Sequence, residues 1–249
     1  MRALVLAAGL GTRLRPWTLA HPKALVPVGG RPMLDRVLSR LATEGFDEAV
    51  VNVHHFADQI IDFLDANDFG MRVGVSDESS ELLDTGGGLA VAADRFVGDG
   101  PVLVHNADIL SDAPLGEIMD IHNREGNDIT LLTSGRESSR KLVFDADGRL
   151  AGWHNLKDDT FRPQGFGRRI NDHLHESAFS GIYVVGERAL ENIKNYGLRL
   201  GIRKFPIMDY LLSMPEGIII RECYLPQLNL IDIGRPETLR EANLALDLE

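Results

Sequence analysis

The sequence has little of several features that mark specialised classes of protein. It has one cysteine, Cys223, so no internal disulfide can form, and this favours a reducing compartment. No apolar run approaches the roughly 18–20 residues that span a bilayer, so we expect no membrane partner. Gly/Ser-rich linkers, low-complexity tracts and hexapeptide repeats are also missing. With 44% apolar and 25% charged residues, the composition excludes disordered, collagen-like and coiled-coil chains.

Positive charge is scarce overall but concentrated near the N-terminus. The 249-residue chain has a formal net charge of −11, which argues against a nucleic-acid partner. Residues 1–40 nevertheless hold a net charge of +6. A basic helix face would account for Arg36 and Arg40. It accounts less well for Arg13, Arg15 and Lys23, which point to a local anion site.

Short apolar runs alternate with helical patterns in the first half of the chain. The run at 3–8 is too short for a signal peptide and has no Ala-x-Ala cleavage pattern, so we expect a buried strand and a cytoplasmic protein. Alternating β and α units predict a three-layer α/β/α fold with a mixed, mainly parallel sheet. Ligands in such sheets usually bind beyond the carboxyl ends of the strands. Strands are predicted at 2–7, 48–53, 71–75, 101–105 and 128–133.

The second half is less regular, and one domain over 1–249 is the simplest interpretation. Asp147-Gly148 predicts a hairpin between strands at 141–145 and 149–153. Polar residues 154–178 are interpreted as a long excursion. A strand at 181–185, a helix around 205–212, strands near 217–221 and 229–233 and a last helix from Pro236 follow. Within this domain, residues 1–135 form the regular first half and 136–249 the second half.

A glycine-rich turn follows the first predicted strand. Gly9 and Gly11 let the backbone approach a ligand and leave N–H groups facing anions. The Lys-Ser/Thr of a P-loop is absent, and Leu14 breaks the dinucleotide pattern. A plain βα turn is the alternative, but the nearby Arg13, Arg15 and Lys23 favour a phosphate cradle.

The motifs together resemble those of the sugar-1-phosphate nucleotidyltransferases, the NDP-sugar pyrophosphorylases. The resemblance rests on LAAGLGTRLRP at 6–16, PKALVPV at 22–28, DTGGG at 84–88, VHNAD at 104–108, FSGIY at 179–183 and LIDIG at 230–234. It implies a Rossmann-like nucleotidyltransferase fold, with residues 1–135 as the nucleotide-binding half and 136–249 as the sugar-binding half. It also implies transfer of a nucleoside monophosphate from an NTP to a sugar 1-phosphate, with release of pyrophosphate and use of Mg²⁺.

The resemblance assigns roles residue by residue. Arg13 would bind the leaving pyrophosphate and Lys23 the transferred α-phosphate, while Asp108 and Asp232 would be the Mg²⁺ pair. Each aspartate taken alone would more often be a cap or a surface residue, and only the matching positions in the family assign them to the metal. The nucleotide would be bound by Ala7, Ala8, Gly9, Gly11, Thr12, Thr85, Gly86, Gly87, Gly88 and Asn106. An N-capped helix start is the alternative for 85–88.

The sugar side departs from the family pattern. Many relatives hold the sugar phosphate with a Glu-Lys pair after the hairpin, where this chain reads His154-Asn155-Leu156-Lys157. The candidates that remain are Arg140, Asn155 and Lys157, with Ser180 and Gly181 on a sugar-facing strand.

The resemblance leaves the base, the sugar and the oligomeric state open. It is strongest to N-acetylmuramate 1-phosphate uridylyltransferases, with mannose- and heptose-1-phosphate guanylyltransferases next, so UTP or GTP is the expected donor. The product would be a precursor of cell wall or polysaccharide. A catalytically silent nucleotide-sugar-binding regulatory subunit and a cytidylyltransferase for another alcohol phosphate are the alternatives. An oligomer is compatible with the sequence.

Overall fold

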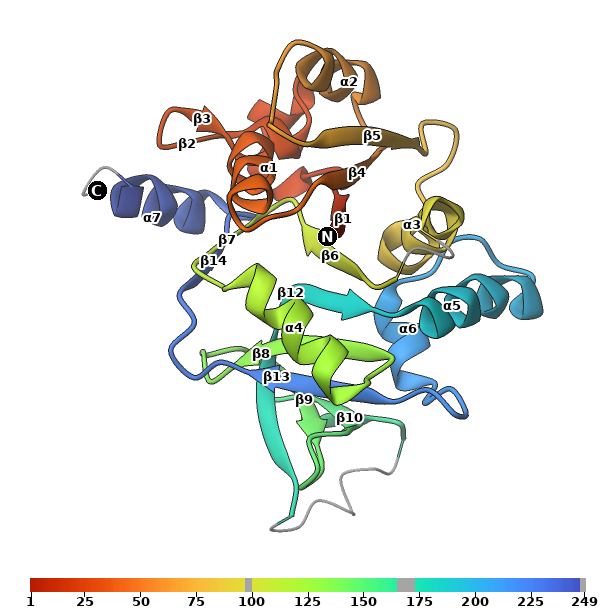
Figure 1. The fold of residues 1–249 in the computed structure, drawn as a ribbon. Coiled ribbons are helices and arrows are strands. Elements are labelled where there is room, and N and C mark those ends of the chain that lie inside the picture. The colour runs from red at the N-terminus through yellow and green to blue at the C-terminus, as the bar shows by residue number, and fades with distance from the viewer. Residues whose placement is uncertain (97–99, 165–172, 247–249) are drawn as a thin grey trace.

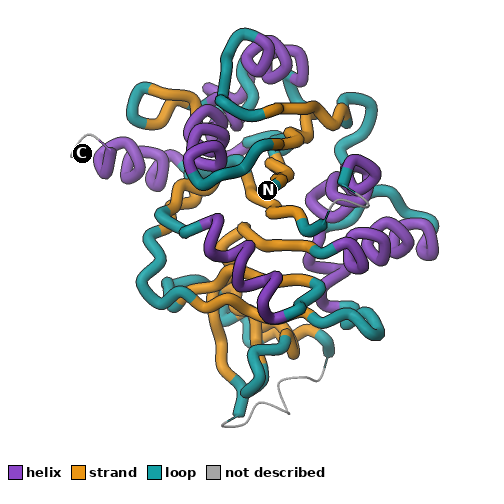
Figure 2. The backbone as a smooth tube through the Cα atoms, viewed as in Figure 1, coloured by secondary structure: helices purple, strands orange, loops and turns teal. Residues whose placement is uncertain are grey.

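The computed structural model describes residues 1–96, 100–164 and 173–246, which form a layered α/β molecule (Figures 1 and 2). A ten-stranded sheet runs in the order β11-β10-β9-β12-β6-β1-β4-β5, and β8 joins β12 to β13. Its strands are β1 Arg2–Leu6, β4 Glu48–Val53, β5 Arg72–Asp77, β6 Val102–Asn106, β8 Ile129–Ser134, β9 Arg140–Phe144, β10 Leu150–Asn155, β11 Thr160–Arg162, β12 His175–Val185 and β13 Ile220–Tyr224. The predicted mixed α/β/α sheet is therefore confirmed.

Successive side chains of the central strands point to opposite faces of the sheet, and both faces are buried. Leu4 of β1 packs with α3, α5 and α6, whereas its neighbours Ala3 and Val5 pack with α1, α2, α4 and α7 on the other face. Each face buries its own apolar core, as a sheet between two helical layers requires. In Figure 1, α3, α5 and α6 gather on the right. The helices are α1 Met33–Thr43, α2 Ala57–Asp65, α3 Asp84–Ala92, α4 Leu115–Glu125, α5 Glu187–Leu200, α6 Ile207–Leu212 and α7 Pro236–Leu246.

Strand direction places one edge of the sheet beside all the central loops. β6, β1, β4 and β5 are parallel, so their carboxyl ends lie at the same edge. β12 runs antiparallel to β6 and to β8, and therefore β8 also ends at that edge. Two short strands, β7 Ile109–Ser111 and β14 Leu230–Asp232, pair beyond it, and a separate ribbon joins β2 Pro27–Val28 to β3 Arg31–Pro32.

The second half differs from its predicted elements in three places. The strand predicted near 217–221 is β13, which begins at Ile220, because its apolar residues pair with β8 in that register. The excursion predicted at 154–178 includes strand residues: β10 continues to Asn155, β11 pairs with it, and β12 begins at His175. Residues 165–172 lie outside the described residues. Helix α5 was not among the predicted elements.

The predicted division of the chain at residue 135 stays a prediction. β8 lies in the first half, yet its neighbours β12 and β13 belong to the second.

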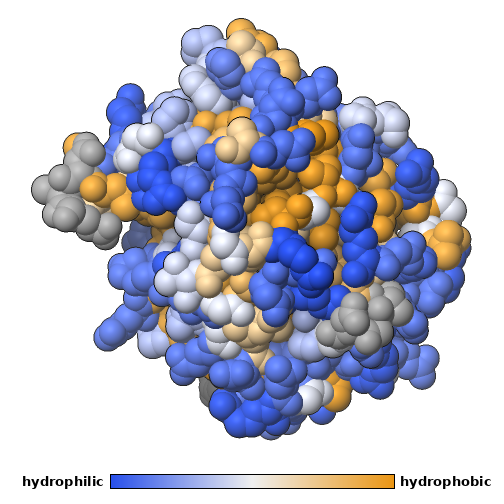
Figure 3. Space-filling view, turned by 45° about the horizontal axis from the view of Figure 1, so that its top comes forward, coloured by the Kyte–Doolittle hydropathy of each residue, from blue (hydrophilic) through white to orange (hydrophobic). Residues whose placement is uncertain are grey.

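The face seen in Figure 3 has hydrophilic residues around its periphery and hydrophobic ones gathered toward its middle. Within the described ranges, none of the helices has the length and apolar composition that a bilayer crossing requires.

Candidate active site

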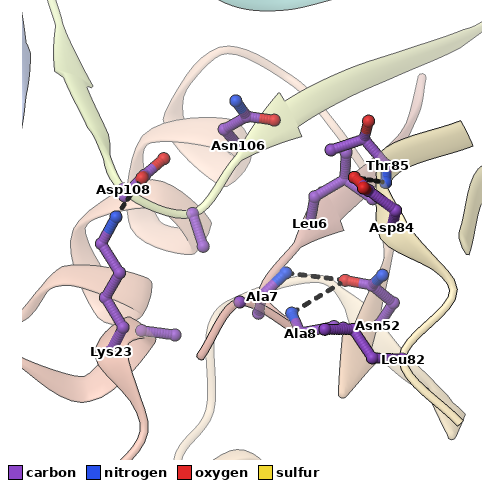
Figure 4. Close-up of a pocket in the computed structure, with 13 residues that line it drawn as sticks. Leu6, Ala7, Ala8, Lys23, Asn52, Leu82, Asp84, Thr85, Asn106 and Asp108 are labelled. Carbon is purple, nitrogen blue, oxygen red and sulfur yellow. Dashed lines mark hydrogen bonds and ion pairs between the residues drawn. The ribbon is translucent and has the colours of Figure 1, made fainter. Parts of the chain in front are cut away.

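A pocket of about 270 Å³ lies beyond the carboxyl ends of β1, β4 and β6 (Figure 4). Lys23 and Asp108 stand on one side of it, and Asn52, Asp84 and Thr85 stand on the other. The pocket therefore has a charged side and a side of mixed polar and apolar character. Its lining residues are Leu6, Ala7, Ala8, Gly9, Lys23, Ala24, Asn52, Leu82, Asp84, Thr85, Asn106, Ala107 and Asp108.

The loop after β1 presents free backbone donors next to this pocket. In the described part of the chain, the amides of Gly9, Leu10 and Gly11 form no hydrogen bond. Gly11 has a φ of +61°, which favours glycine, and a Cβ there would lie 2.8 Å from the Cβ of Lys23. The Thr18 hydroxyl donates to the Gly11 carbonyl at 2.8 Å and holds the turn. This open loop is suited to an anionic ligand.

The exposed residues that follow continue the basic character of the loop. Thr12 and Arg13 begin a short 3₁₀ helix, Thr12–Leu14, and its Leu14 side chain is buried. Lys23 begins a second such turn, Lys23–Leu25. Buried Leu14 and Ala24 anchor the two turns, so the polar side chains beside them are held at the pocket edge.

Three of the predicted catalytic and metal-binding side chains surround Gly234. A Cβ on this glycine would lie 2.6 Å from Arg13 Nη2, 2.7 Å from Asp232 Oδ1 and 3.0 Å from Lys23 Nζ. Lys23 Nζ also forms an ion pair with Asp108 Oδ2. Residues far apart in the sequence thus form one cluster of two cations and two carboxylates.

Strand pairing brings the two aspartates together. β7 and β14 are antiparallel, with Asp232 opposite Ile109, and the Ile233 amide donates to the Asp108 carbonyl at 3.0 Å. Carboxylate oxygens are hard donors, and Mg²⁺ is usually bound by one or two of them together with substrate phosphates. Among the described residues, no group of three potential metal ligands occurs. The two carboxylates beside the cationic cluster fit a magnesium ion whose other ligands come from phosphate.

The three glycines of α3 serve packing. Cβ atoms on Gly86 and Gly87 would lie 2.5 Å from the Phe205 ring and 2.2 Å from the Arg203 carbonyl oxygen. The amides of Gly86 and Gly87 donate to the Phe205 carbonyl at 2.9 and 3.1 Å. These two amides are consequently engaged by the segment before α6, and of residues 85–88 only Thr85 lines the pocket. The Thr85 hydroxyl accepts the Ile207 amide.

A buried amide–carboxyl pair connects β1, β4 and α3. Asn52 Oδ1 accepts the amides of Ala7 at 2.7 Å and Ala8 at 3.3 Å, and its Nδ2 donates to Glu78 Oε1 at 2.8 Å. A Cβ on Gly88 would lie 2.7 Å from both of these side chains. Burial raises the pKa of the Glu78 carboxyl, although the hydrogen bond from Asn52 opposes the rise.

Asn52 and Glu78 were absent from the predicted site. The available signal was a polar residue within the apolar run of β4 and an acidic residue just after β5. Asn52 Oδ1 accepts hydrogen bonds from the amides of Ala7 and Ala8. These two alanines therefore line the pocket without a free N–H group to offer a ligand.

The predicted sugar-binding residues do not converge as the phosphate cluster does. Arg140 is exposed at the start of β9, and Asn155 pairs opposite it at the end of β10. The buried Ser180 hydroxyl donates to the Leu132 carbonyl at 2.8 Å and does not line the pocket. Gly181 has a φ of +79°, and a Cβ there would lie 2.7 Å from Nδ2 of the pocket residue Asn106. Gly181 thus allows β12 to pass close to the site.

Comparisons with known proteins identify the family and the fold. A family model described as nucleotidyl transferase matches residues 2–144. The N-acetylmuramate alpha-1-phosphate uridylyltransferase of Caulobacter vibrioides is 48% identical over 109 residues, which are 43% of this chain and 45% of that protein. A probable mannose-1-phosphate guanylyltransferase 1 of Oryza sativa subsp. japonica is 30% identical over 199 residues, 78% of this chain and 52% of that one. The chain spans about half the length of these curated relatives.

A solved structure shows the same fold over nearly the whole chain. It is a putative glucose-1-phosphate thymidylyltransferase from Bacillus anthracis, with a TM-score of 0.76 over 99% of this chain and 95% of that one. At 18% sequence identity, this likeness concerns the fold. The family model, in contrast, covers more than half of the sequence and includes the loop after β1, Lys23 and Asp108. The chain therefore belongs to the nucleotidyl transferase family.

Proposed function

We propose that this chain transfers a nucleoside monophosphate from an NTP to a sugar 1-phosphate and releases pyrophosphate. The observation that carries the proposal is the cluster of Arg13, Lys23, Asp108 and Asp232 beside a pocket with a less charged far side. Two polyanionic substrates repel each other, and this cluster places cations where they would meet. The nucleotide base would lie toward Leu82, Asp84 and Thr85, with its phosphates toward Lys23.

The proposed reaction needs no protein base. An oxygen of the sugar phosphate attacks the α-phosphorus, and the bond from that phosphorus to the oxygen bridging to the β-phosphate breaks as pyrophosphate leaves. The second pKa of a phosphate monoester is about 6, so the attacking group is mostly dianionic near neutral pH. Catalysis then depends on alignment and on stabilisation of charge. Lys23 would bind the α-phosphate, and Arg13 would neutralise the departing pyrophosphate.

The two aspartates would hold Mg²⁺. A bound magnesium ion would supply positive charge against the phosphate oxygens of the nucleotide. Asp108 already forms an ion pair with the Lys23 ammonium, so this carboxylate also orients the lysine side chain. Asp232 Oδ1 accepts the Gly234 amide at 2.8 Å, which fixes its orientation. We place the reaction in the cytoplasm.

The donor and acceptor can be ranked from the relatives. The uridylyltransferase from Caulobacter vibrioides has the higher identity, which favours UTP and an N-acetylmuramate 1-phosphate-like acceptor. The guanylyltransferase matches more of the chain and supports GTP with mannose 1-phosphate as the second candidate. Heptose 1-phosphate stays a candidate on the resemblance of the sequence motifs. A catalytically silent regulatory subunit is the alternative from another class, and the retained charged cluster argues against it.

One experiment tests these proposals together. The four common NTPs are incubated with a panel of sugar 1-phosphates and MgCl₂, and released pyrophosphate is measured. Turnover by UTP or GTP with one acceptor, abolished by EDTA and restored by Mg²⁺, is the expected result. Nucleotide-sugar binding without pyrophosphate release from any pair would instead identify a regulatory protein.

A further inference from the structure

Arg136 lies beside the site but was not among the predicted site residues. It follows the fully buried strand β8 by two residues, at the edge where β1, β4 and β6 end. The Lys141 ammonium donates to the Arg136 carbonyl at 2.8 Å, which ties the backbone of this loop to the start of β9. The loop therefore has a defined place relative to the sheet edge.

A bulge in β12 links Arg136 to the pocket. Arg136 Nη2 donates to the Phe179 carbonyl at 2.8 Å, and the register between β8 and β12 shifts just after Phe179. Two residues further, Gly181 approaches Asn106, which lines the pocket. The guanidinium is consequently attached to the part of β12 that passes the pocket residue Asn106.

The environment of Arg136 is that of a cation without a full set of partners. Burial lowers the pKa of its guanidinium, and the nearby charge of Asp232 opposes that shift. Its Nε is buried and has no hydrogen-bond partner. None of the ion pairs formed within the described ranges includes Arg136. A desolvated guanidinium with unused donors favours an anionic ligand, because a guanidinium offers five N–H groups to phosphate or carboxylate oxygens.

The other polar groups of this region are less suited to a phosphate. The Lys141 ammonium already donates to the Arg136 carbonyl, and the Ser180 hydroxyl already donates to the Leu132 carbonyl. Arg140 is exposed, so water screens its charge more strongly. Arg136 combines partial burial, spare donors and proximity to Asp232, which lies in the cluster with Arg13 and Lys23.

We propose that the guanidinium of Arg136 binds the phosphate of the sugar 1-phosphate and positions its attacking oxygen toward the α-phosphate held by Lys23. This inference rests on the proposed nucleotidyl transfer and deepens it. It assigns the acceptor phosphate to a residue before the β9–β10 hairpin, where the family pattern after the hairpin is not kept. Arg136 Nη2 would keep one of its hydrogens on the Phe179 carbonyl, while its second hydrogen and Nη1 face the phosphate as an end-on pair of donors, a geometry that lysine lacks.

The test compares Arg136→Ala and Arg136→Lys with the wild-type enzyme, using the NTP and sugar 1-phosphate pair that the pyrophosphate assay identifies. Loss of a charged hydrogen-bonding partner should raise the KM for the sugar 1-phosphate roughly 10- to 100-fold. The KM for the NTP should stay within about two-fold of the wild-type value. Arg136→Lys should recover part of the loss, since it restores charge without the paired donors.

Two controls separate binding from folding. Arg149→Ala removes an exposed arginine at the far turn of the same hairpin and should leave both KM values unchanged. The free sugar without phosphate should inhibit the wild type and Arg136→Ala equally, whereas inorganic phosphate should compete with the sugar 1-phosphate better in the wild type. Each variant is checked by thermal unfolding.

The outcomes distinguish this inference from the proposed function. An active wild type with an unchanged sugar 1-phosphate KM in Arg136→Ala would overturn the role of Arg136 and leave nucleotidyl transfer intact. Equal increases in both KM values, with a lowered Tm, would assign Arg136 to support of the β12 bulge and also overturn it. A wild type without turnover for any substrate pair would overturn the proposed function, and the role of Arg136 with it.

Discussion

Two glycine-rich segments border the same pocket, and glycine has a different role in each. At Gly9 a Cβ would meet nothing within 4 Å, and the amides of Gly9, Leu10 and Gly11 have no partner among the described residues. At Gly87 a Cβ would lie 2.2 Å from a backbone oxygen, and the amide is already bonded. The loop after β1 therefore has free amides and room for a ligand, whereas the start of α3 is packed against residues 203–205 and its amides are already bonded.

The comparison separates turnover from folding. Substitutions in and around the open loop should change how substrates are bound or converted, because few protein contacts are lost there. Substitutions at the start of α3 should change stability, because this helix packs tightly on residues 203–205. The predictions that follow test this separation, from the largest expected effect to the smallest.

Arg13→Ala should give the largest loss of activity with little change in folding. Removing one preorganised donor to developing charge typically lowers kcat about 10²–10³-fold, or roughly 3–4 kcal/mol. Steady-state pyrophosphate release and thermal unfolding are measured together. Arg72→Ala, at a comparably exposed arginine far from the pocket, is the control. An unchanged kcat would remove Arg13 from the mechanism.

Gly87→Ala and Gly9→Ala form a matched pair across the two segments. Overpacking against the Arg203 carbonyl should lower the free energy of unfolding of Gly87→Ala by about 1–3 kcal/mol. Gly9→Ala should unfold at the wild-type temperature or slightly above it, since restricting the unfolded chain contributes about 0.4–1 kcal/mol. Its KM for the NTP should rise. Equal stability loss in both variants, measured by urea unfolding, would contradict the distinction.

Asn52→Ala tests the buried link between the segments. The amides of Ala7 and Ala8 would lose their acceptor, and Glu78 would lose its donor. Buried polar groups left without partners should lower the free energy of unfolding by about 1–3 kcal/mol. Denaturant titration measures this, with Asn67→Ala at an exposed helix end as the control. A variant as stable as the wild type would show that water replaces the amide at no net cost.

His154 provides a pH test in a region outside both segments. Burial lowers the pKa of its imidazole, but hydrogen bonds to Glu176 at 2.6 Å and Asp159 at 2.9 Å outweigh this and raise the pKa. The protonated ring therefore stabilises the fold fully below the ordinary histidine pKa of about 6.5, and this contribution is lost as pH rises through the raised value. The Tm difference between wild type and His154→Gln should be larger at low pH.

This difference is measured by thermal unfolding at about pH 5.5 and about pH 9, on either side of the ordinary histidine pKa. The Asp145→Asn variant, in the turn between β9 and β10, serves as a control for general effects of pH on the hairpin. A Tm difference that does not change with pH would mean that the ring acts through packing on Phe161 alone, whose centroid lies 3.8 Å away.

Much of the fold could be predicted because buried parallel strands have a local signature. The apolar β-branched runs predicted at 2–7, 48–53 and 101–105 correspond to β1, β4 and β6 within a residue or so. The polar stretch at 154–178 gave no such signal, since β11 is exposed on its edge and is held by pairing with β10. Strands of this kind depend on a partner strand rather than on their own periodicity.

The sequence by itself determined the family, the α/β architecture and the charged residues Arg13, Lys23, Asp108 and Asp232, because these depend on residue types at short spacings. Tertiary structure alone decided which of them meet, since the pairing of β7 with β14 brings Asp232 to Asp108. It also decided that Gly86 and Gly87 pack against residues 203–205, and that Asn52 accepts hydrogen bonds from the amides of Ala7 and Ala8. The same holds for the position of Arg136 near Asp232. Steric contact and desolvation are properties of neighbours in space, and a linear pattern does not contain them.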